Sequence, residues 1–220
     1  MSAKFLFSGL ISVCLLWSCT KVKYKTPTLS KHEQELIMDG KDDEVMRVLL
    51  ITNPKDSVLL RTKSVNFNFP TDKKLAEKLS KRMLATVTDS ATMGVGIAAP
   101  QVGVLKNLIL VQRFDKKEEP IEAYYNPKIT SYSKLKQPCL EGCLSIPNKM
   151  DTTRNRAYAI LLEYDELSGV HKTEMVEDFT AVIFQHEIDH LNGILFLDHL
   201  DEEIKAAEDS LKLSQHRNGK

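Results

Sequence analysis

The sequence predicts an α+β fold. Short apolar runs typical of strands gather in the middle of the chain, at residues 108–112, 157–164 and 170–176. Helical patterns lie before and after these runs and do not alternate with them. Because a parallel sheet needs a long crossover connection after each strand, this order favours segregated helices and strands over an alternating α/β fold.

The composition is ordinary for a soluble globular protein. The 220 residues include 30 Lys and Arg and 30 Asp and Glu, so the formal net charge is zero. This balance argues against direct DNA binding, which depends on a basic surface. Four cysteines in a chain of this length exclude a small scaffold held together by disulfides.

Residues 1–19 have the pattern of an export signal. Lys4 precedes an apolar stretch that is shorter than the roughly 20 residues of a membrane span. The letters LWSC at residues 16–19 resemble a bacterial lipobox, in which Cys19 is the lipidated residue. We therefore expect residues 1–19 to be a signal peptide and lipobox, with membrane attachment through Cys19. An uncleaved N-terminal anchor is the alternative.

Residues 20–44 are predicted to be a linker followed by a short helix. The first part is polar and basic and contains a proline, and Ser30 is a typical N-cap for a helix that ends at Gly40. The apolar run at residues 45–52 ends at an Asn-Pro pair, and we predict a buried strand there.

The remaining elements follow from spacing and capping. A helix opens at Thr71 or Asp72, because apolar residues four apart follow it. The runs at residues 157–164 and 170–176 flank a turn that contains a glycine, which is typical of a hairpin.

The last part of the chain is predicted to be helical. Asp178 caps a helix that runs to Asn192, with Gly193 as its stop. Residues 201–220 are predicted to form a solvated C-terminal helix and tail.

The helix before Asn192 contains the motif H-E-x-x-H. Residues four apart share one face of a helix, so His186 and His190 can present two imidazoles to one metal ion. Glu187 follows the first histidine and suits proton transfer to and from a water molecule. The preceding residues 179–184 are almost entirely apolar, and a metal would offset the cost of burying these polar groups.

A metal site of this kind usually takes a third ligand from the protein. The metzincin pattern is excluded, because its third histidine position holds Phe196. Glu208 is the nearest glutamate for a thermolysin-like arrangement, but its surroundings do not fit. Cys143 lies upstream in the loop-like stretch EGCLS, and a thiolate is a strong metal ligand. Pairing of Cys143 with Cys139 in a disulfide is the alternative.

A glycine-containing stretch, GVGIAAPQ at residues 94–101, is the third feature. Its spacing is similar to a dinucleotide-binding fingerprint, but Pro100 stands where the helix of that fingerprint should run. Two glycines allow close approach of the backbone to a ligand, and Gln101 offers a neutral donor for a carbonyl oxygen. An ordinary tight turn is the other interpretation.

Together and in this order, GVGIAAPQ, EGCLS and QHEIDHLNG resemble the three motifs of the peptide deformylase family. The resemblance covers residues 45–200, which we expect to be the catalytic domain. It implies a fold with antiparallel sheets around a central metal-binding helix.

The resemblance also implies roles for individual residues. It makes Cys143, His186 and His190 the metal ligands and Glu187 the acid and base. It assigns stabilisation of the oxyanion to Gln101 and to the backbone N–H of Leu144. The implied metal is Fe²⁺, with Zn²⁺, Ni²⁺ or Co²⁺ as substitutes.

The implied substrates are N-formyl-methionyl peptides, from which formate is released. Their binding would use six residues: Gly94, Val95, Gly96, Glu141, Gly142 and Val182. The family acts on new chains in the cytoplasm, and the ribosome is a candidate partner, whereas the leader predicts a membrane-anchored lipoprotein. Two alternatives remain: a metallopeptidase of the H-E-x-x-H type, and a metal-binding lipoprotein without enzymatic activity.

Overall fold

The computed structural model describes residues 29–69, 71–91 and 93–218. Along the chain the elements are α1 (Lys31–Met38), α2 (Pro54–Leu60), α3 (Lys73–Thr88), β1 (Gly96–Ala98), the 3₁₀ turn η1 (Ala99–Val102), β2 (Leu108–Gln112), β3 (Ile121–Tyr132), β4 (Lys136–Cys143), β5 (Ile146–Ala157), β6 (Ala159–Asp165), β7 (His171–Glu177), α4 (Asp178–Leu191) and α5 (Phe196–Asn218).

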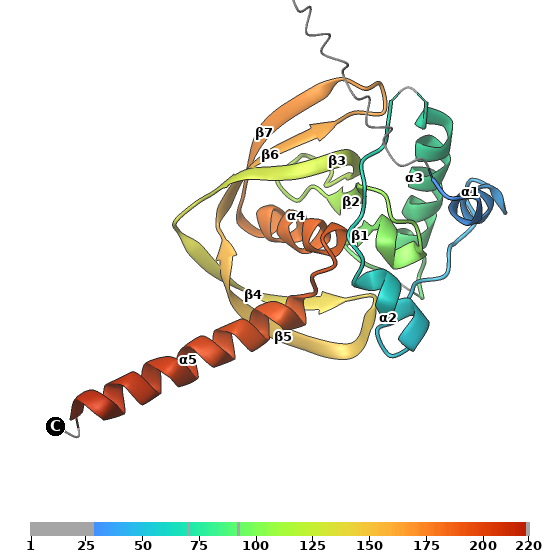
Figure 1. Cartoon of the computed structure of the whole chain (residues 1–220). Helices are drawn as coiled ribbons and strands as arrows, with labels where there is room; N and C mark the ends of the chain where they lie inside the picture. Colours follow the sequence, from blue (N-terminus) through green and yellow to red (C-terminus); the bar gives the residue numbers. More distant parts are fainter. Residues whose placement is uncertain (1–28, 70, 92, 219–220) are drawn as a thin grey trace, which may run out of the picture.

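The strands form two antiparallel sheets. Five of them pair in the order β1-β2-β3-β6-β7, and the two long strands β4 and β5 form a separate hairpin. Helix α4 lies between the five-stranded sheet and this hairpin (Figure 1). The α+β class and the central position of the helix that carries H-E-x-x-H are therefore confirmed.

Helix α4 is buried because its non-polar residues meet the sheet on one side. Ile183, Phe184 and Ile188 join a core cluster with side chains of β2 and β6. Gln185 fastens the helix to the end of β5: its Oε1 accepts from the backbone N–H of Ala157, and its Nε2 donates to the carbonyl of Ala157, both at 2.9 Å. These contacts hold the two histidines of the helix in a defined position.

A second core cluster lies on the other side of β1 and β2. Leu79 and Met83 of α3 pack there with Ile97 and Leu108, and all four are fully buried. The apolar spacing that predicted α3 thus marks the face that covers the sheet.

The prediction of a strand at residues 45–52 is wrong. This segment has no strand in the structure and makes single backbone hydrogen bonds to separate partners. The N–H of Leu49 donates to the carbonyl of Gln101 at 2.7 Å, and the N–H of Ile51 donates to that of Ser145 at 2.9 Å. The run is apolar because it crosses between two buried turns, not because it lies in a sheet.

Several local predictions are confirmed. Ser30 caps α1 in a capping box with Glu33, and the expected hairpin is β6 and β7. Two predictions need adjustment. The N-cap of α4 is Glu177 instead of Asp178, and no side chain caps this end of the helix. Helix α5 begins at Phe196, five residues before the predicted start of the C-terminal helix.

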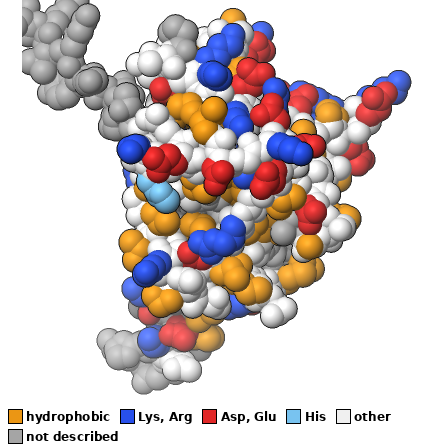
Figure 2. Space-filling model, turned by 90° about the vertical axis from the view of Figure 1, so that its right-hand side faces the viewer, with side chains coloured by type: hydrophobic (Ala, Val, Ile, Leu, Met, Phe, Trp, Pro, Cys, Tyr) orange, Lys and Arg blue, Asp and Glu red, His pale blue; other side chains and the backbone are white. Residues whose placement is uncertain are grey.

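The outer surface carries charges of both signs. On the side of the molecule that bears α1 and α3, Lys and Arg side chains alternate with Asp and Glu side chains (Figure 2). Within the described residues, no helix is both long enough and apolar enough to cross a membrane. The predicted signal peptide and Cys19 lie outside these residues.

Candidate active site

Cys143 is the last residue of β4, and Leu144 and Ser145 form the turn into β5. The interpretation of EGCLS as a loop is therefore wrong for its first three residues, which belong to a strand. The alternative disulfide is also wrong, because Cys139 and Cys143 are both free thiols. Strand pairing in the hairpin fixes the direction in which Cys143 faces α4.

The folded chain brings Cys143 to the two histidines of α4. The ligand atoms of Cys143, His186 and His190 all lie within 4.8 Å of one another, and Cys143 Sγ is 3.2 Å from His190 Nε2. Burial raises the pKa of the Cys143 thiol, but the two imidazoles outweigh it and hold that pKa well below its ordinary value. A thiolate and two imidazoles are a donor set that suits a divalent transition metal.

Glu141 orients the first histidine. Its Oε2 lies 2.8 Å from His186 Nδ1, which leaves the other ring nitrogen to face Cys143. Arg156 binds both oxygens of Glu141 at 2.8 Å, and Thr153 donates to Oε1. Burial raises the pKa of Glu141, but His186 and Arg156 lower it far below its usual range, so the carboxylate stays ionised.

Arg156 extends this network from the hairpin to α4 and α5. Its Nη1 lies 2.6 Å from Asp189 Oδ2, which also lies 2.8 Å from His199 Nε2. Sequence reasoning missed Arg156 and Thr153, and it gave no role to Asp189. These residues are 12 to 48 positions from Glu141, so no short motif joins them. Asp189, the aspartate of the motif QHEIDH, was the sequence feature that could have indicated this network.

Glu187 faces the same group from inside the protein. Its side chain is buried, and Oε2 has no hydrogen-bond partner among the described residues. Burial raises the pKa of Glu187 to about 7, although the neighbouring imidazoles oppose the shift. A carboxyl group with a pKa near neutrality suits both acceptance and donation of a proton.

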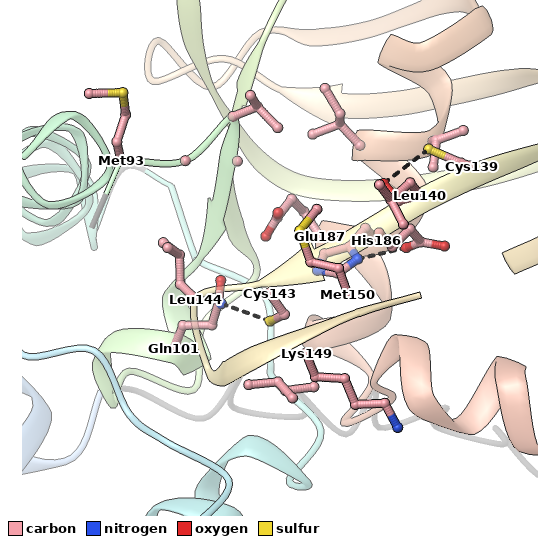
Figure 3. A pocket seen from close by; sticks show the side chains of 18 of the residues that line it. Met93, Gln101, Cys139, Leu140, Cys143, Leu144, Lys149, Met150, His186 and Glu187 are labelled. Atoms are coloured by element: carbon pink, nitrogen blue, oxygen red, sulfur yellow. Dashed lines mark hydrogen bonds and ion pairs between the residues drawn. The ribbon is translucent and has the colours of Figure 1, made fainter. Parts of the chain in front are cut away.

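Gln101 approaches Cys143 from the 3₁₀ turn after β1. Its Oε1 accepts from the backbone N–H of Ala98 at 2.8 Å, which turns Nε2 toward the site. Nε2 lies 3.5 Å from Cys143 Sγ (Figure 3) and also 3.3 Å from Ser145 Oγ. These long contacts leave its donor capacity available to a ligand.

One cavity of about 840 Å³ is lined by Cys143, His186 and Glu187. All six residues expected to bind substrate line it, namely Gly94, Val95, Gly96, Glu141, Gly142 and Val182. Leu144 and Gln101 line it as well. Sequence reasoning missed the remaining wall residues, which come from distant parts of the chain and include Met93, Leu140, Met150, Phe179 and Ile183.

Strand β1 borders this cavity at the edge of its sheet. It pairs only with β2 in the five-stranded sheet, so its second edge is available to an extended ligand. Gly96 has a specific reason to lack a side chain: a Cβ there would lie 2.5 Å from Glu187 Oε1. The glycine therefore leaves the space that the buried carboxylate occupies.

A thiolate, two imidazoles and a buried carboxyl group around one cavity define a metal-dependent hydrolase. Comparisons with known proteins agree. The family model for polypeptide deformylase matches residues 45–206. The peptide deformylase of a Caulobacter species is 38% identical over 157 residues, which cover 71% of this chain and 88% of the relative. That of a Synechocystis species is 44% identical over 137 residues, or 61% and 71% of the two chains.

Solved structures show the same fold. A class I type b peptide deformylase from Acinetobacter baumannii with bound Met-Ala-Ser has a TM-score of 0.61 and 30% identity. The match covers 71% of this chain and 99% of that one. The chain belongs to the peptide deformylase family, and it removes N-formyl groups from newly made peptides.

Proposed function

We propose that the cavity between β1 and β4 is where the formyl group of a formyl-methionyl peptide is hydrolysed. The observation that carries this proposal is a group of three ligand residues, two of which, Cys143 and His186, line one cavity with Glu187, whose buried Oε2 has no hydrogen-bond partner among the described residues. A purely structural metal site does not require a buried carboxylate oxygen without a hydrogen-bond partner.

Cys143, His186 and His190 would hold the metal. When bound, a divalent metal lowers the pKa of a water ligand toward neutrality and polarises a carbonyl group. We propose Fe²⁺ as the native ion, with Zn²⁺, Ni²⁺ or Co²⁺ as substitutes. The mixed thiolate and imidazole donors are compatible with all four ions.

Glu187 is proposed as the acid and base. It accepts the proton of the attacking water and passes it to the amine that leaves as the free N-terminus of methionine. Its raised pKa supports both steps, because the group exchanges a proton readily near neutral pH.

Gln101 and the backbone N–H of Leu144 are proposed to stabilise the oxyanion. Negative charge develops on the formyl oxygen during attack, and donors already in place stabilise it without reorganisation. The hydrogen bond between Gln101 Oε1 and Ala98 N–H supports this role, since it keeps Nε2 directed into the cavity.

The substrate backbone is proposed to lie as an added strand along residues 94–96, with Gly142 on the opposite wall. Main-chain hydrogen bonds then give affinity without regard to sequence. The methionine side chain would enter the apolar part of the cavity beside Val95, Glu141 and Val182. The Met-Ala-Ser bound to the relative from Acinetobacter baumannii is a peptide of this kind.

The decisive measurement is formate release from formyl-Met-Ala-Ser by anaerobically purified, iron-loaded protein. We expect Glu187→Gln to lower kcat by about 10²- to 10⁴-fold while the metal content is unchanged. No release by the wild type would contradict the proposal and support a metal-binding lipoprotein without activity. A Cys143→Ala variant that keeps its metal and cleaves ordinary peptides would indicate a metallopeptidase.

The location of the enzyme is a separate proposal. We propose that Cys19 is lipidated and attaches the catalytic domain to a membrane, which would set this chain apart from family members that work beside the ribosome. Fractionation of wild type and Cys19→Ala tests this. Recovery of both in the soluble fraction would contradict lipidation. Co-sedimentation with ribosomes would instead support the ribosome as partner.

A further inference from the structure

Large apolar side chains stand exposed along the rim of the cavity. Leu140 is 58% exposed and Met150 is 64% exposed, and both line the cavity that contains Glu187. Met93, which is 75% exposed, lines it from the segment before β1. Exposed apolar surface around a cavity is typical of a site that receives apolar groups of a ligand.

The strand register places Leu140 and Met150 next to each other. Gly142 of β4 pairs directly with Met150 of β5, so these two residues share one face of the hairpin. Leu140 lies two residues before Gly142 and therefore has the same face. A Cβ on Gly142 would lie 3.2 Å from Met150 Cγ, which shows that the Met150 side chain lies over the glycine.

The opposite face of β4 carries the catalytic groups. Glu141 and Cys143 alternate with Leu140 and Gly142 along the strand, and Glu141 points to His186 and Arg156. Figure 3 shows the side chains of Leu140 and Met150 at the site, whereas the amine of Lys149 extends away from them. The outer face beside the cavity is thus apolar at Leu140 and Met150, and the neutral Thr152 lies opposite Leu140.

Successive side chains of an extended peptide would contact these two faces alternately. This step rests on the proposed function, in which the peptide lies along β1 and β4. If the methionine side chain enters the pocket beside Glu141, the next side chain points the other way, because successive side chains of a strand alternate. It then lies on the face of Leu140 and Met150.

We propose that Leu140 and Met150, with Met93 across the groove, are specificity-determining residues for the residue that follows formyl-methionine. They favour peptides with an apolar side chain at that position. Met150 is well suited to this, because its unbranched thioether adapts to apolar groups of different shape. Asparagine or aspartate there would lose hydration without gaining a hydrogen bond from this surface.

The test compares formyl-Met-Leu-Ala with formyl-Met-Asn-Ala, whose second side chains have similar size. We expect kcat/KM to be about 5- to 10-fold higher for the leucine peptide with the wild type. Met150→Gln and Leu140→Gln should each reduce this ratio several-fold, and Met150→Leu should keep it. Both positions are exposed, so these substitutions leave the core intact.

Met175→Gln is the matched control, since Met175 is 61% exposed on β7 and does not line the cavity. It should keep both the ratio and the activity of the wild type. Equal kcat/KM for the two peptides, or a ratio unchanged in Met150→Gln and Leu140→Gln, would overturn this inference. Failure to release formate from either peptide would instead contradict the proposed function.

Discussion

Gly96 and Glu187 show how one missing side chain makes room for the carboxyl group that we propose as the acid and base. A Cβ on residue 96 would lie 2.5 Å from Glu187 Oε1 and 2.9 Å from Glu187 Cδ, which is too close for both groups to fit. The second glycine of the motif at residues 94–101 therefore sets the position of the Glu187 carboxyl group, in addition to its proposed part in substrate binding.

We predict that Gly96→Ala lowers kcat by about 100-fold, because displacement of a catalytic group by roughly an ångström has an effect of this size. Metal content, measured by elemental analysis, should equal that of the wild type. Gly94→Ala is the control, since a Cβ there has no neighbour closer than 3.4 Å, and its kcat should fall far less. Wild-type kcat in Gly96→Ala would contradict this account.

Arg156 is the residue that the motifs leave out. It is 3% exposed and neutralises both Glu141 and Asp189, and Glu141 in turn orients His186. A buried carboxylate beside a metal ligand needs such a counter-charge. Nothing in the local sequence distinguishes Arg156 from Arg154, which is exposed two residues earlier on the same strand.

At the scale of elements, the segment at residues 45–52 shows why an apolar run is not always a strand. Arg47 pairs with both oxygens of Asp56 at 2.8 and 2.9 Å, and the N–H of Leu50 donates to Asp56 at 3.0 Å. The segment is thus fastened to the start of α2 by one carboxylate.

This carboxylate predicts a specific acid sensitivity. Hydrogen bonds from Arg47, followed by that from Leu50, lower the pKa of Asp56 from 3.8 to about 2 in the folded protein. Because the folded value is below the unfolded one, the stabilisation is present above about pH 4 and is lost as the pH falls toward 2.

We therefore expect Asp56→Asn to unfold at a lower urea concentration than the wild type at pH 7. The difference between the two should shrink between about pH 4 and pH 2. Other carboxylates titrate in the same range, so the comparison of the two proteins, and not the acid sensitivity of one, is the measurement. A difference that stays constant down to pH 2.5 would refute the role of Asp56.

The end of α4 depends on another glycine. Gly193 has φ +73°, and a Cβ there would overlap the carbonyl oxygen of Arg61. Since Arg61 also binds Asp198 and the N–H of Ser64 donates to the carbonyl of Leu191 at 2.8 Å, this glycine allows α4 to pack against the segment after α2.

Gly193→Ala should lower the free energy of unfolding by about 2 kcal/mol or more, from the left-handed backbone and the overlap together. Gly169→Ala isolates the first of these contributions, because Gly169 has φ +84° but no atom closer than 3.6 Å to an added Cβ. Urea denaturation measures both. An equal loss of unfolding free energy in the two variants would show that the overlap with Arg61 does not contribute to the effect of Gly193→Ala.

At the scale of the whole molecule, the ligand group joins two layers. Cys143 belongs to the β4–β5 hairpin and the histidines belong to α4, which packs on the five-stranded sheet. A metal that binds all three therefore links the hairpin to the rest of the domain, and any ligand that binds only the folded state stabilises it.

Removal of the metal by a chelator should lower Tm by about 10 °C in scanning calorimetry, if the metal is present at about a thousandfold above its Kd. Cys143→Ser should have a low Tm that responds little to the chelator. Cys139→Ser is the control, because Cys139 lies outside the ligand group, and it should respond as the wild type does. A wild-type Tm that is unchanged by complete metal removal would contradict the proposed metal link between the hairpin and the rest of the domain.

By itself, the sequence determined the fold class, the family and the residues of the metal group. The reason is that these features are short in range: His186 and His190 are one helical turn apart, and each of the three motifs is a continuous stretch. The same holds for α1, whose capping box is complete within four residues.

Only the tertiary structure decided which distant residues complete the site. Arg156 reaches Glu141 and Asp189, Met150 covers Gly142, and residues 45–52 cross between two turns instead of joining a sheet. These contacts depend on strand register and on the packing of α4 against the hairpin. A one-residue shift in register would reverse the faces of β4 and exchange the side that bears Glu141 and Cys143 with the side that bears Leu140.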